Sequence, residues 1–425
     1  MERSTRDESV DGSGGSLAQG KRLIRSLCLR NFLSYGPSSP EIKLLPLNVL
    51  IGPNASGKSN LIEALGVLRA TPRDLTMAIR EGGGVAEWLW KGPAAAPAAE
   101  IVAIVEPVPG RCEALRYGLA FAMVGQRFQV TGEVVSFQSP VTGEEDMPFL
   151  YHYESGDPVV SVQAVAGEGD PSAPHHGRIQ RSLWRDDIDP EQSVLSQLRD
   201  PDQYPEITYV GRQFGRIRLY REWNLGRNTE PRKPQAADLP EDFLQEDAAN
   251  LGVVLNDLQH RPATWQTVLD YLKKYYELAE AVTTKIHGGT VQLYLHEKGL
   301  SAPVPATRLS DGTLRWLCLL SILCHPEPPP LVCIEEPELG LHPDIIPTIA
   351  ELLVDASQRM QLIVTTHSDI LVSALTDVPE AVLVCERDED GTRVRRLDRE
   401  QLKDWLEKYT LGELWTMGEI GGTRW

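Results

Sequence analysis

The chain has 425 residues, of which 41% are hydrophobic, and a formal net charge of −18. This length suffices for one large domain or two ordinary ones, and the negative charge argues against sequence-blind DNA binding over the whole surface. The apolar runs are too short to span a bilayer, and the first residues lack the apolar core of a signal peptide. We therefore expect a cytoplasmic protein without membrane contact. Six cysteines without a C-x-x-C pair predict reduced core thiols rather than disulfides or a metal site.

The N-terminal part of the chain predicts a tail, two strands and a helix. Residues 1–20 are polar and contain a glycine- and serine-rich run, which predicts a disordered tail. Residues 21–29 alternate apolar and polar side chains and predict a strand, and the apolar run 47–51 predicts a second one. A segment with helical spacing then extends from Asn60 to about Arg69. The eight residues between the second strand and this helix carry the strongest motif of the chain.

Residues 52–59 match the pattern G-x-x-x-x-G-K-[ST] between a strand and a helix, which is the setting that this motif requires. Gly52 and Gly57 let the backbone bend around a phosphate, and successive N–H groups with the helix dipole form an anion site. Lys58 adds a positive charge for the β- and γ-phosphates, and the Ser59 hydroxyl is a ligand for Mg²⁺. The alternative is a glycine-rich turn, but the pattern and both flanks favour a nucleoside triphosphate site. Its residues are Gly52, Pro53, Asn54, Ala55, Ser56, Gly57, Lys58, Ser59 and Asn60.

The middle of the chain predicts an antiparallel sheet and then helices. Residues from about 100 to 165 show period-two segments separated by turn residues, which predicts antiparallel strands appended to the core. Residues 167–174 predict a loop, and helices are expected near 192–198 and within 247–279. Two short strands, near 282–286 and 290–297, are expected to lead back to the core.

The C-terminal third alternates strands and helices. Apolar runs at 331–334 and 362–364 predict buried strands, and helices are expected at 312–324, 343–357 and 369–376. Residues 381–385 and 392–396 predict a strand pair, and Asp398 predicts the N-cap of a helix through Glu407. The tail at 411–425 is expected to pack on its own domain, with docking on a partner as the alternative. Strand–helix alternation at both ends predicts an α/β fold in one discontinuous domain. Its core is expected at about 21–165 and 282–425, with an inserted helical arm at about 166–281.

Two adjacent carboxylates, Glu335 and Glu336, follow the predicted strand at 331–334. In open α/β sheets, ligands bind at the carboxyl ends of the strands. One such acid can hold the Mg²⁺ that Ser59 contacts, and the next can orient and deprotonate an attacking water. We assign Glu335 to the metal and Glu336 to the base. Taken alone, the pair would instead favour an acidic surface turn.

Two further segments support the functional interpretation. Ser310, Asp311 and Gly312 open a predicted helix upstream of the acids, where the helix dipole favours a second anion site. His367 follows the next predicted strand, where it could contact a γ-phosphate. Taken alone, the segment Ser310–Gly312 would suit a helix cap, and His367 would suit a structural histidine. The four elements in this order favour one nucleotide-hydrolysing site.

The order of the motifs resembles that of the ABC-type ATPase head. Residues 52–59, 309–313, 331–336, 340–344 and His367 are similar to its Walker A, signature, Walker B, D-loop and switch-histidine motifs. More narrowly, the chain resembles the RecF/SMC-like and OLD-like AAA-type ATPases of bacteria. This narrower resemblance is carried by residues 29–32, 52–54, 59–61, 335–338 and 341–343.

The resemblance implies a P-loop NTPase with an ABC-type head that binds ATP and Mg²⁺. Two heads would sandwich two ATP molecules, each held by one copy's P-loop and the other copy's Ser310, Asp311 and Gly312. It implies Lys58, Glu336 and His367 as catalytic residues and hydrolysis as the step that releases the homodimer. Asp311 and Thr313 stand where transporters favour Gly and Gln, and Glu335 stands where most P-loop enzymes have Asp. The Q-loop glutamine is left open between Gln126 and Gln129.

The stretch 211–233 is the basic part of the chain, with aromatic residues interleaved. Arginines bind phosphates and aromatic rings stack on bases, so DNA contact is one hypothesis. A solvated helix face, or a dock for an acidic partner, is the alternative. The basic residues are Arg212, Arg216, Arg218, Arg221, Arg227, Arg232 and Lys233.

Three classes of function follow from the resemblance. The first is an ATPase in DNA repair or genome maintenance, and the second is a sensor ATPase of antiphage defence that works with a separate effector protein. The third, an OLD-type nuclease, is disfavoured because only about forty residues follow Cys385. A transporter subunit is also disfavoured by the divergent signature and the acidic surface.

Overall fold

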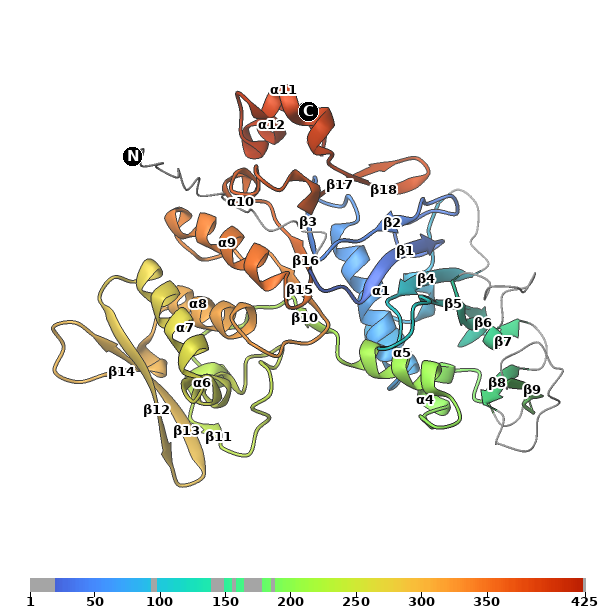
Figure 1. Ribbon diagram of the computed structural model, residues 1–425, viewed down its shortest axis with the longest axis horizontal. Helices are drawn as coiled ribbons and strands as arrows, with labels where there is room; N and C mark the ends of the chain where they lie inside the picture. Colours follow the sequence, from blue (N-terminus) through green and yellow to red (C-terminus); the bar gives the residue numbers. More distant parts are fainter. Residues whose placement is uncertain are drawn as a thin grey trace, which may run out of the picture.

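The computed structural model describes residues 20–92, 98–138, 149–154, 158–163, 178–184 and 188–422. Nearly all of the predicted tail, the predicted loop at 167–174 and the last three residues lie outside these ranges. Three sheets organise the described chain, and Figure 1 shows their arrangement. Within the described ranges, no helix is both long enough and apolar enough to cross a membrane.

The central sheet has six strands in the order β10-β15-β16-β3-β17-β18. Its first five strands run parallel, and β18 pairs antiparallel with β17. Every residue of β3 and β16 is buried, which explains why these strands are continuous apolar runs in the sequence. The strands are β10 (Arg218–Tyr220), β15 (Leu331–Glu335), β16 (Gln361–Thr365), β3 (Leu47–Ile51), β17 (Val382–Asp388) and β18 (Gly391–Arg396).

The second sheet has eight strands in the order β2-β1-β4-β5-β6-β7-β8-β9, all antiparallel. It confirms the antiparallel sheet predicted from the period-two segments. Helix α1 (Lys58–Ala70) shares one hydrophobic cluster with this sheet and with the central sheet. The strands are β1 (Ile24–Arg30), β2 (Ile42–Lys43), β4 (Ala99–Val105), β5 (Leu115–Val124), β6 (Arg127–Phe137), β7 (Phe149–Glu154), β8 (Val159–Gln163) and β9 (Arg178–Ser182).

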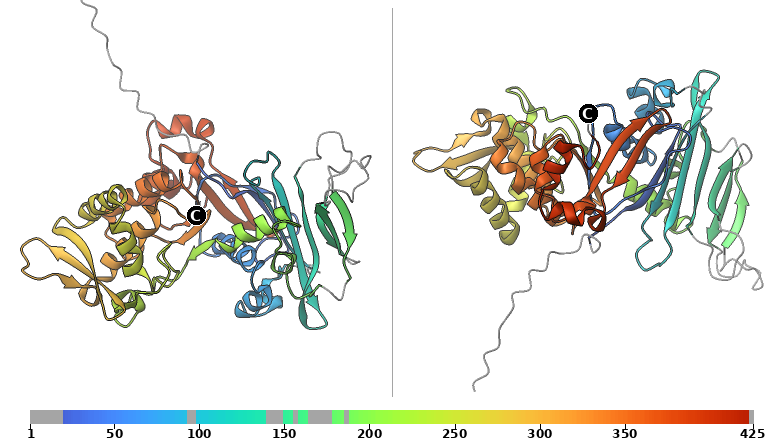
Figure 2. Two further views of the ribbon diagram at one scale, coloured as in Figure 1. Left: turned by 60° about the horizontal axis from the view of Figure 1, so that its bottom comes forward. Right: turned by 90° about the horizontal axis from the view of Figure 1, so that it is seen from above.

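A helical region with a small sheet lies at the opposite end of the molecule from the antiparallel sheet, as both views of Figure 2 show. Its sheet joins β12 (Ala279–His287) and β13 (Thr290–Glu297) to the short strands β11 (Gln235–Ala236) and β14 (Val304–Pro305). Helices α6 (Leu251–Gln259), α7 (Pro262–Tyr275), α8 (Asp311–Leu323) and α9 (Ile346–Ala356) pack into a second hydrophobic cluster, which also reaches β3 and β15.

The remaining helices are short. They are α2 (Leu75–Glu81), α3 (Val85–Trp88), α4 (Val194–Gln197), α5 (Pro205–Gly215), α10 (Asp369–Ser373), α11 (Arg399–Leu406) and α12 (Leu411–Met417), with 3₁₀ turns η3 (Glu230–Arg232), η4 (Ala306–Arg308), η5 (Pro343–Ile345) and η6 (Pro379–Ala381). Asp398 accepts hydrogen bonds from the first turn of α11, which confirms the predicted cap.

Two expectations need correction. Strand β10 lies within the interval 166–281 that was predicted as an inserted arm, yet it belongs to the central sheet beside β15. The sequence could not show this because β10 is only three residues long. The boundaries of the proposed core and arm stay a prediction. The expectation of core thiols does not hold for Cys112, which is exposed in the loop before β5, or for Cys28, which is only half-buried.

The tail at 411–422 packs on its own domain. Leu411, Leu414 and Trp415 of α12 and the following Ile420 are buried in the hydrophobic cluster around the helices. The backbone N–H of Gly422 then donates to Glu386 Oε1 at 2.9 Å. The described part of the tail therefore follows the expectation of packing on its own domain.

Candidate nucleotide-binding site

The loop at 52–59 joins the end of β3 to the start of α1. Gly52 has φ 145° and Gly57 has φ 98°, values that favour glycine. A Cβ on Gly52 would lie 2.2 Å from the carbonyl oxygen of Cys385, and one on Gly57 would lie 2.2 Å from Thr392 Oγ1. The two glycines are therefore required by backbone conformation and by space.

A second layer of residues holds this loop from outside. Thr392 Oγ1 donates to the Ser56 carbonyl at 3.0 Å, and the Tyr35 hydroxyl donates to the Gly57 carbonyl at 3.2 Å. Asn60 Nδ2 donates to Ser34 Oγ at 2.7 Å, and Ser34 Oγ lies 2.7 Å from Thr392 Oγ1. Sequence reasoning gave Asn60 a place in the site but missed Ser34, Tyr35 and Thr392.

The polar groups inside the loop suit a phosphate. Lys58 is 6% exposed, and its Nζ donates to the carbonyls of Gly52 at 2.7 Å and Pro53 at 3.0 Å. Burial lowers the pKa of Lys58, and the nearby Glu336 and Glu335 oppose this shift. Ser56 Oγ is buried and has no hydrogen-bond partner among the described residues. An unpartnered hydroxyl beside a confined ammonium fits an anionic ligand, since an unsatisfied buried group is otherwise unfavourable.

The structure brings Ser59 and Glu335 together. Glu335 ends β15, and its carboxylate accepts a hydrogen bond from the Ser59 side chain. Burial raises the pKa of Glu335, and the Arg221 guanidinium opposes that effect with Nε 3.7 Å from Glu335 Oε1. A hydroxyl and a carboxylate are oxygen ligands of the kind that Mg²⁺ takes, so this pair fits the predicted metal site.

Glu336 and His367 face each other across the ends of β15 and β16. His367 Nε2 lies 3.8 Å from Glu336 Oε1. Burial and then the charge of Lys58 lower the pKa of His367, which favours the neutral imidazole. Glu336 has φ 47°, a conformation that costs a non-glycine residue about 1–3 kcal/mol and clusters at active sites. Its backbone is held by a hydrogen bond to Thr365 O at 3.0 Å and one from Arg315 Nη1 at 3.3 Å.

Glu338 orders the segment that carries His367. Its Oε1 accepts hydrogen bonds from Thr366 Oγ1 at 2.6 Å and from the His367 N–H at 3.0 Å. Glu338 is buried, so these bonds fix the backbone that presents the imidazole. Sequence reasoning included Glu338 in the family resemblance but gave it no role, because its partners Thr366 and His367 lie in a distant segment that follows β16.

Ser310, Asp311 and Gly312 form the N-terminus of α8. Ser310 Oγ caps the helix by accepting from the Thr313 N–H at 3.0 Å, and Asp311 is paired with Arg232. Over the ranges given above, these three residues make no hydrogen bond or ion pair with the loop at 52–59. Ser310 and Asp311 are exposed. The predicted second anion site at this cap is therefore not part of the site around its own P-loop.

The basic stretch 211–233 does not form one patch. Arg212 and Arg216 are exposed, but Arg221 binds Glu63 at 2.7 Å and lies beside Glu335, and Arg232 is buried. The stretch spans α5, β10 and η3, so its side chains point in different directions. Phe214 and Tyr220 are buried in the hydrophobic core, which removes them as stacking platforms for bases.

The predicted Q-loop residues do not reach the site. Gln126 has φ 69° in the exposed turn between β5 and β6, and Gln129 lies on β6. Neither contacts the loop at 52–59, Glu335 or Glu336 in the described part of the chain.

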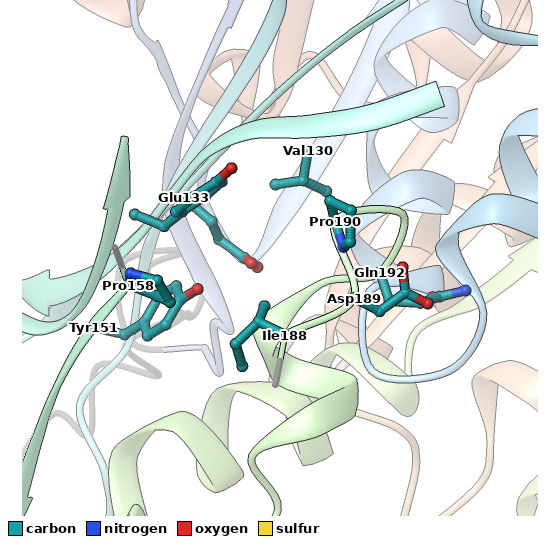
Figure 3. Close-up of a pocket in the computed structure, with 9 residues that line it drawn as sticks. Val130, Glu133, Tyr151, Pro158, Ile188, Asp189, Pro190 and Gln192 are labelled. Atoms are coloured by element: carbon teal, nitrogen blue, oxygen red, sulfur yellow. The ribbon is translucent and has the colours of Figure 1, made fainter. Parts of the chain in front are cut away.

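A separate cavity of about 350 Å³ lies beside the antiparallel sheet (Figure 3). Glu133 lines it, but its carboxylate accepts hydrogen bonds from the Tyr117 hydroxyl at 2.7 Å, the Val194 N–H at 2.8 Å and Ser193 Oγ. Burial raises the pKa of Glu133 to about 7. Because these donors tie β6 to the start of α4, we assign Glu133 a structural role.

Comparisons with known proteins agree with this fold and site. The chain is similar to the solved SMC head bound to the C-winged helix domain of ScpA, with a TM-score of 0.55 over 89% of this chain and 99% of that chain. At 15% identity this likeness concerns the fold alone. The Old nuclease of Escherichia phage P2 is 39% identical over 75 residues, which are 17% of this chain and 12% of that protein.

Fold and site together define an AAA-type P-loop domain with the fold of an ABC-type ATPase head. The family described as "AAA domain, putative AbiEii toxin, Type IV TA system" matches residues 47–126 and 188–373. The chain belongs to this family.

Proposed function

We propose that the protein hydrolyses ATP as a nucleotide-gated homodimer. The observation that carries this proposal is the exposed cap at Ser310, Asp311 and Gly312, which has the features of an anion site but makes no contact with its own P-loop. In a symmetric dimer, each cap would face the nucleotide of the other copy, so the same patch serves both subunits.

The proposed roles follow from the geometry. Lys58 and the N–H groups of the loop at 52–59 bind the phosphates, and Ser59 with Glu335 holds Mg²⁺, which stabilises charge on the phosphates when bound. Glu336 orients and deprotonates the attacking water. His367, whose Nε2 lies 3.8 Å from Glu336 Oε1, forms a hydrogen bond near the γ-phosphate.

The composite site is tested by the rate of hydrolysis at different protein concentrations. If two copies complete each site, the turnover per subunit rises with protein concentration until the dimer saturates. Light scattering with saturating ATP and Mg²⁺ should show the dimer over the same range. A turnover per subunit that is constant from nanomolar to micromolar protein, with a monomer throughout, would contradict the proposal.

The process that ATP serves is proposed to be DNA repair or genome maintenance. Exposed Arg212 and Arg216 line a cavity of about 410 Å³ together with Arg73 and Arg199. These four arginines have no carboxylate partner among the described residues, although the chain has a net charge of −18. Arg218 lies near this cluster on β10, whereas Arg221 forms ion pairs with Glu63 and Glu335. A local arginine cluster of this kind suits a phosphate backbone.

The alternative is a sensor ATPase of antiphage defence with a separate effector protein. It is favoured by the family description, which names a toxin and a toxin–antitoxin system. In that case the arginine cluster would bind an acidic surface of the effector, and an effector such as a nuclease or toxin, encoded by a neighbouring gene, would co-purify with the chain.

Charge reversal at Arg212 and Arg216 separates these processes. For the DNA process, the double variant Arg212→Glu/Arg216→Glu should weaken duplex DNA binding by at least about tenfold and reduce the slope of log affinity against log salt by about two. Fluorescence anisotropy at several salt concentrations measures both. Arg227→Glu, exposed in the same stretch but outside the cavity, is the control. Unchanged, salt-sensitive binding by the double variant would remove the DNA hypothesis for this cluster.

A further inference from the structure

Arg232 is a buried arginine whose contacts converge on the segment before α8. It lies on η3, 79 residues before its partner Asp311, and its side chain is 4% exposed. Nε donates to Leu225 O at 2.8 Å, and Nη1 donates to Leu309 O at 2.6 Å and Ala306 O at 3.3 Å. Nη2 pairs with Asp311. All three guanidinium nitrogens are thus used, and most of their partners lie within 306–311.

These contacts set the position of the cap at Ser310, Asp311 and Gly312. A guanidinium is a planar fork, so its hydrogen bonds restrict direction as well as distance, which a lysine ammonium does not do. The end of α7 also lies against the cap, because a Cβ on Gly312 would lie 2.8 Å from the Tyr275 hydroxyl. Tyr275 in turn stacks on Trp316 of α8, with ring centroids 5.5 Å apart. Arg232 and Tyr275 therefore both restrict the position of the cap before any ligand binds.

Arg232 also offsets the negative charge of Asp311 at the cap. Asp311 is 74% exposed at the N-terminus of α8, where its carboxylate would repel a triphosphate approaching the anion site. The ion pair with Arg232 offsets that charge. Because Arg232 itself is buried, it does so without presenting a competing phosphate contact of its own.

We propose that Arg232 is a positioning residue of the composite site, which fixes the α8 cap and neutralises Asp311 so that the cap accepts the triphosphate of the second copy. This inference rests on the proposed function. It predicts that Arg232 governs assembly around ATP and leaves binding of ATP to the P-loop of a monomer unchanged.

The test uses Arg232→Gln in the full chain, in a Glu336→Gln background that prevents turnover. A fluorescent ATP analogue at low protein concentration should bind within about twofold of the parent, because the P-loop is untouched. Dimerisation at saturating ATP should weaken by at least about tenfold. Arg232→Lys should not restore it, whereas adding Asp311→Gly to Arg232→Gln should restore it in part by removing the unpaired carboxylate. Dimerisation of Arg232→Gln equal to the parent, or no rescue by Asp311→Gly, would overturn the proposal.

Two further measurements keep the test decisive. If Arg232→Gln does not fold, Asp311→Asn is measured instead. This variant should lower the ATP concentration needed for dimerisation. A higher ATP concentration for dimerisation would overturn the charge argument. If the parent itself does not dimerise with ATP, the proposed function fails. Hydrogen exchange in the nucleotide-free monomer then tests the positioning role of Arg232. The amides at 309–314 should exchange faster in Arg232→Gln than in the parent. Unchanged exchange there would refute the positioning role.

Discussion

Glu336→Gln is expected to bind ATP normally and to hydrolyse it about 10²–10⁴ times more slowly. Glutamine keeps the size of the side chain and its hydrogen bonding, but it cannot take a proton from the attacking water. Because hydrolysis is the step proposed to release the two copies, the variant should accumulate as a dimer with ATP and Mg²⁺. Phosphate release and light scattering measure the two effects.

The control for this variant is Glu113→Gln, an equally conservative change at an exposed glutamate away from the site. It should leave turnover and oligomeric state unchanged. If Glu336→Gln turns over ATP at the rate of the unsubstituted protein, Glu336 is not the base. If it stops turnover but stays monomeric with saturating ATP, the sandwich is wrong while the assignment of the base stands.

Lys58→Met is expected to lose ATP affinity by roughly ten- to a hundredfold, because each hydrogen bond from a charged donor contributes about 1.5–3 kcal/mol. Methionine fills a similar volume, so the buried position stays packed. Without bound nucleotide, the proposed dimer should not form and turnover should fall to background. Calorimetric titration with ATP measures the affinity, and thermal unfolding checks that the fold is intact.

The control is Lys43→Met, the same substitution at an exposed lysine on the short strand β2. It should bind and hydrolyse ATP as the unsubstituted protein does. Retained ATP affinity in Lys58→Met, with an unchanged melting temperature, would mean that the loop at 52–59 does not bind the phosphates through this ammonium.

The sequence by itself determined the motifs whose chemistry is local. The loop at 52–59 is recognisable because one turn of backbone, two glycines and a following helix make the whole anion site. Likewise, the acids at 335–336 end an apolar run, and buried parallel strands are continuous apolar runs whatever surrounds them. The order of these segments along the chain also carried the resemblance to the ABC-type head, although the sheet places β3 between β16 and β17 rather than before β15.

Only the tertiary structure decided which side chains support those motifs. The bond between Ser34 and Thr392 joins residues 358 apart, and Arg232 reaches Asp311 over 79 residues. The periodicity of the sequence does not predict such pairs, because they depend on how the sheets and helices pack. For the same reason the sequence could not show how the side chains of the basic stretch 211–233 are distributed. Local composition counts charges, whereas burial and the direction of each side chain divide them between an exposed surface, the Glu335 carboxylate and the α8 cap.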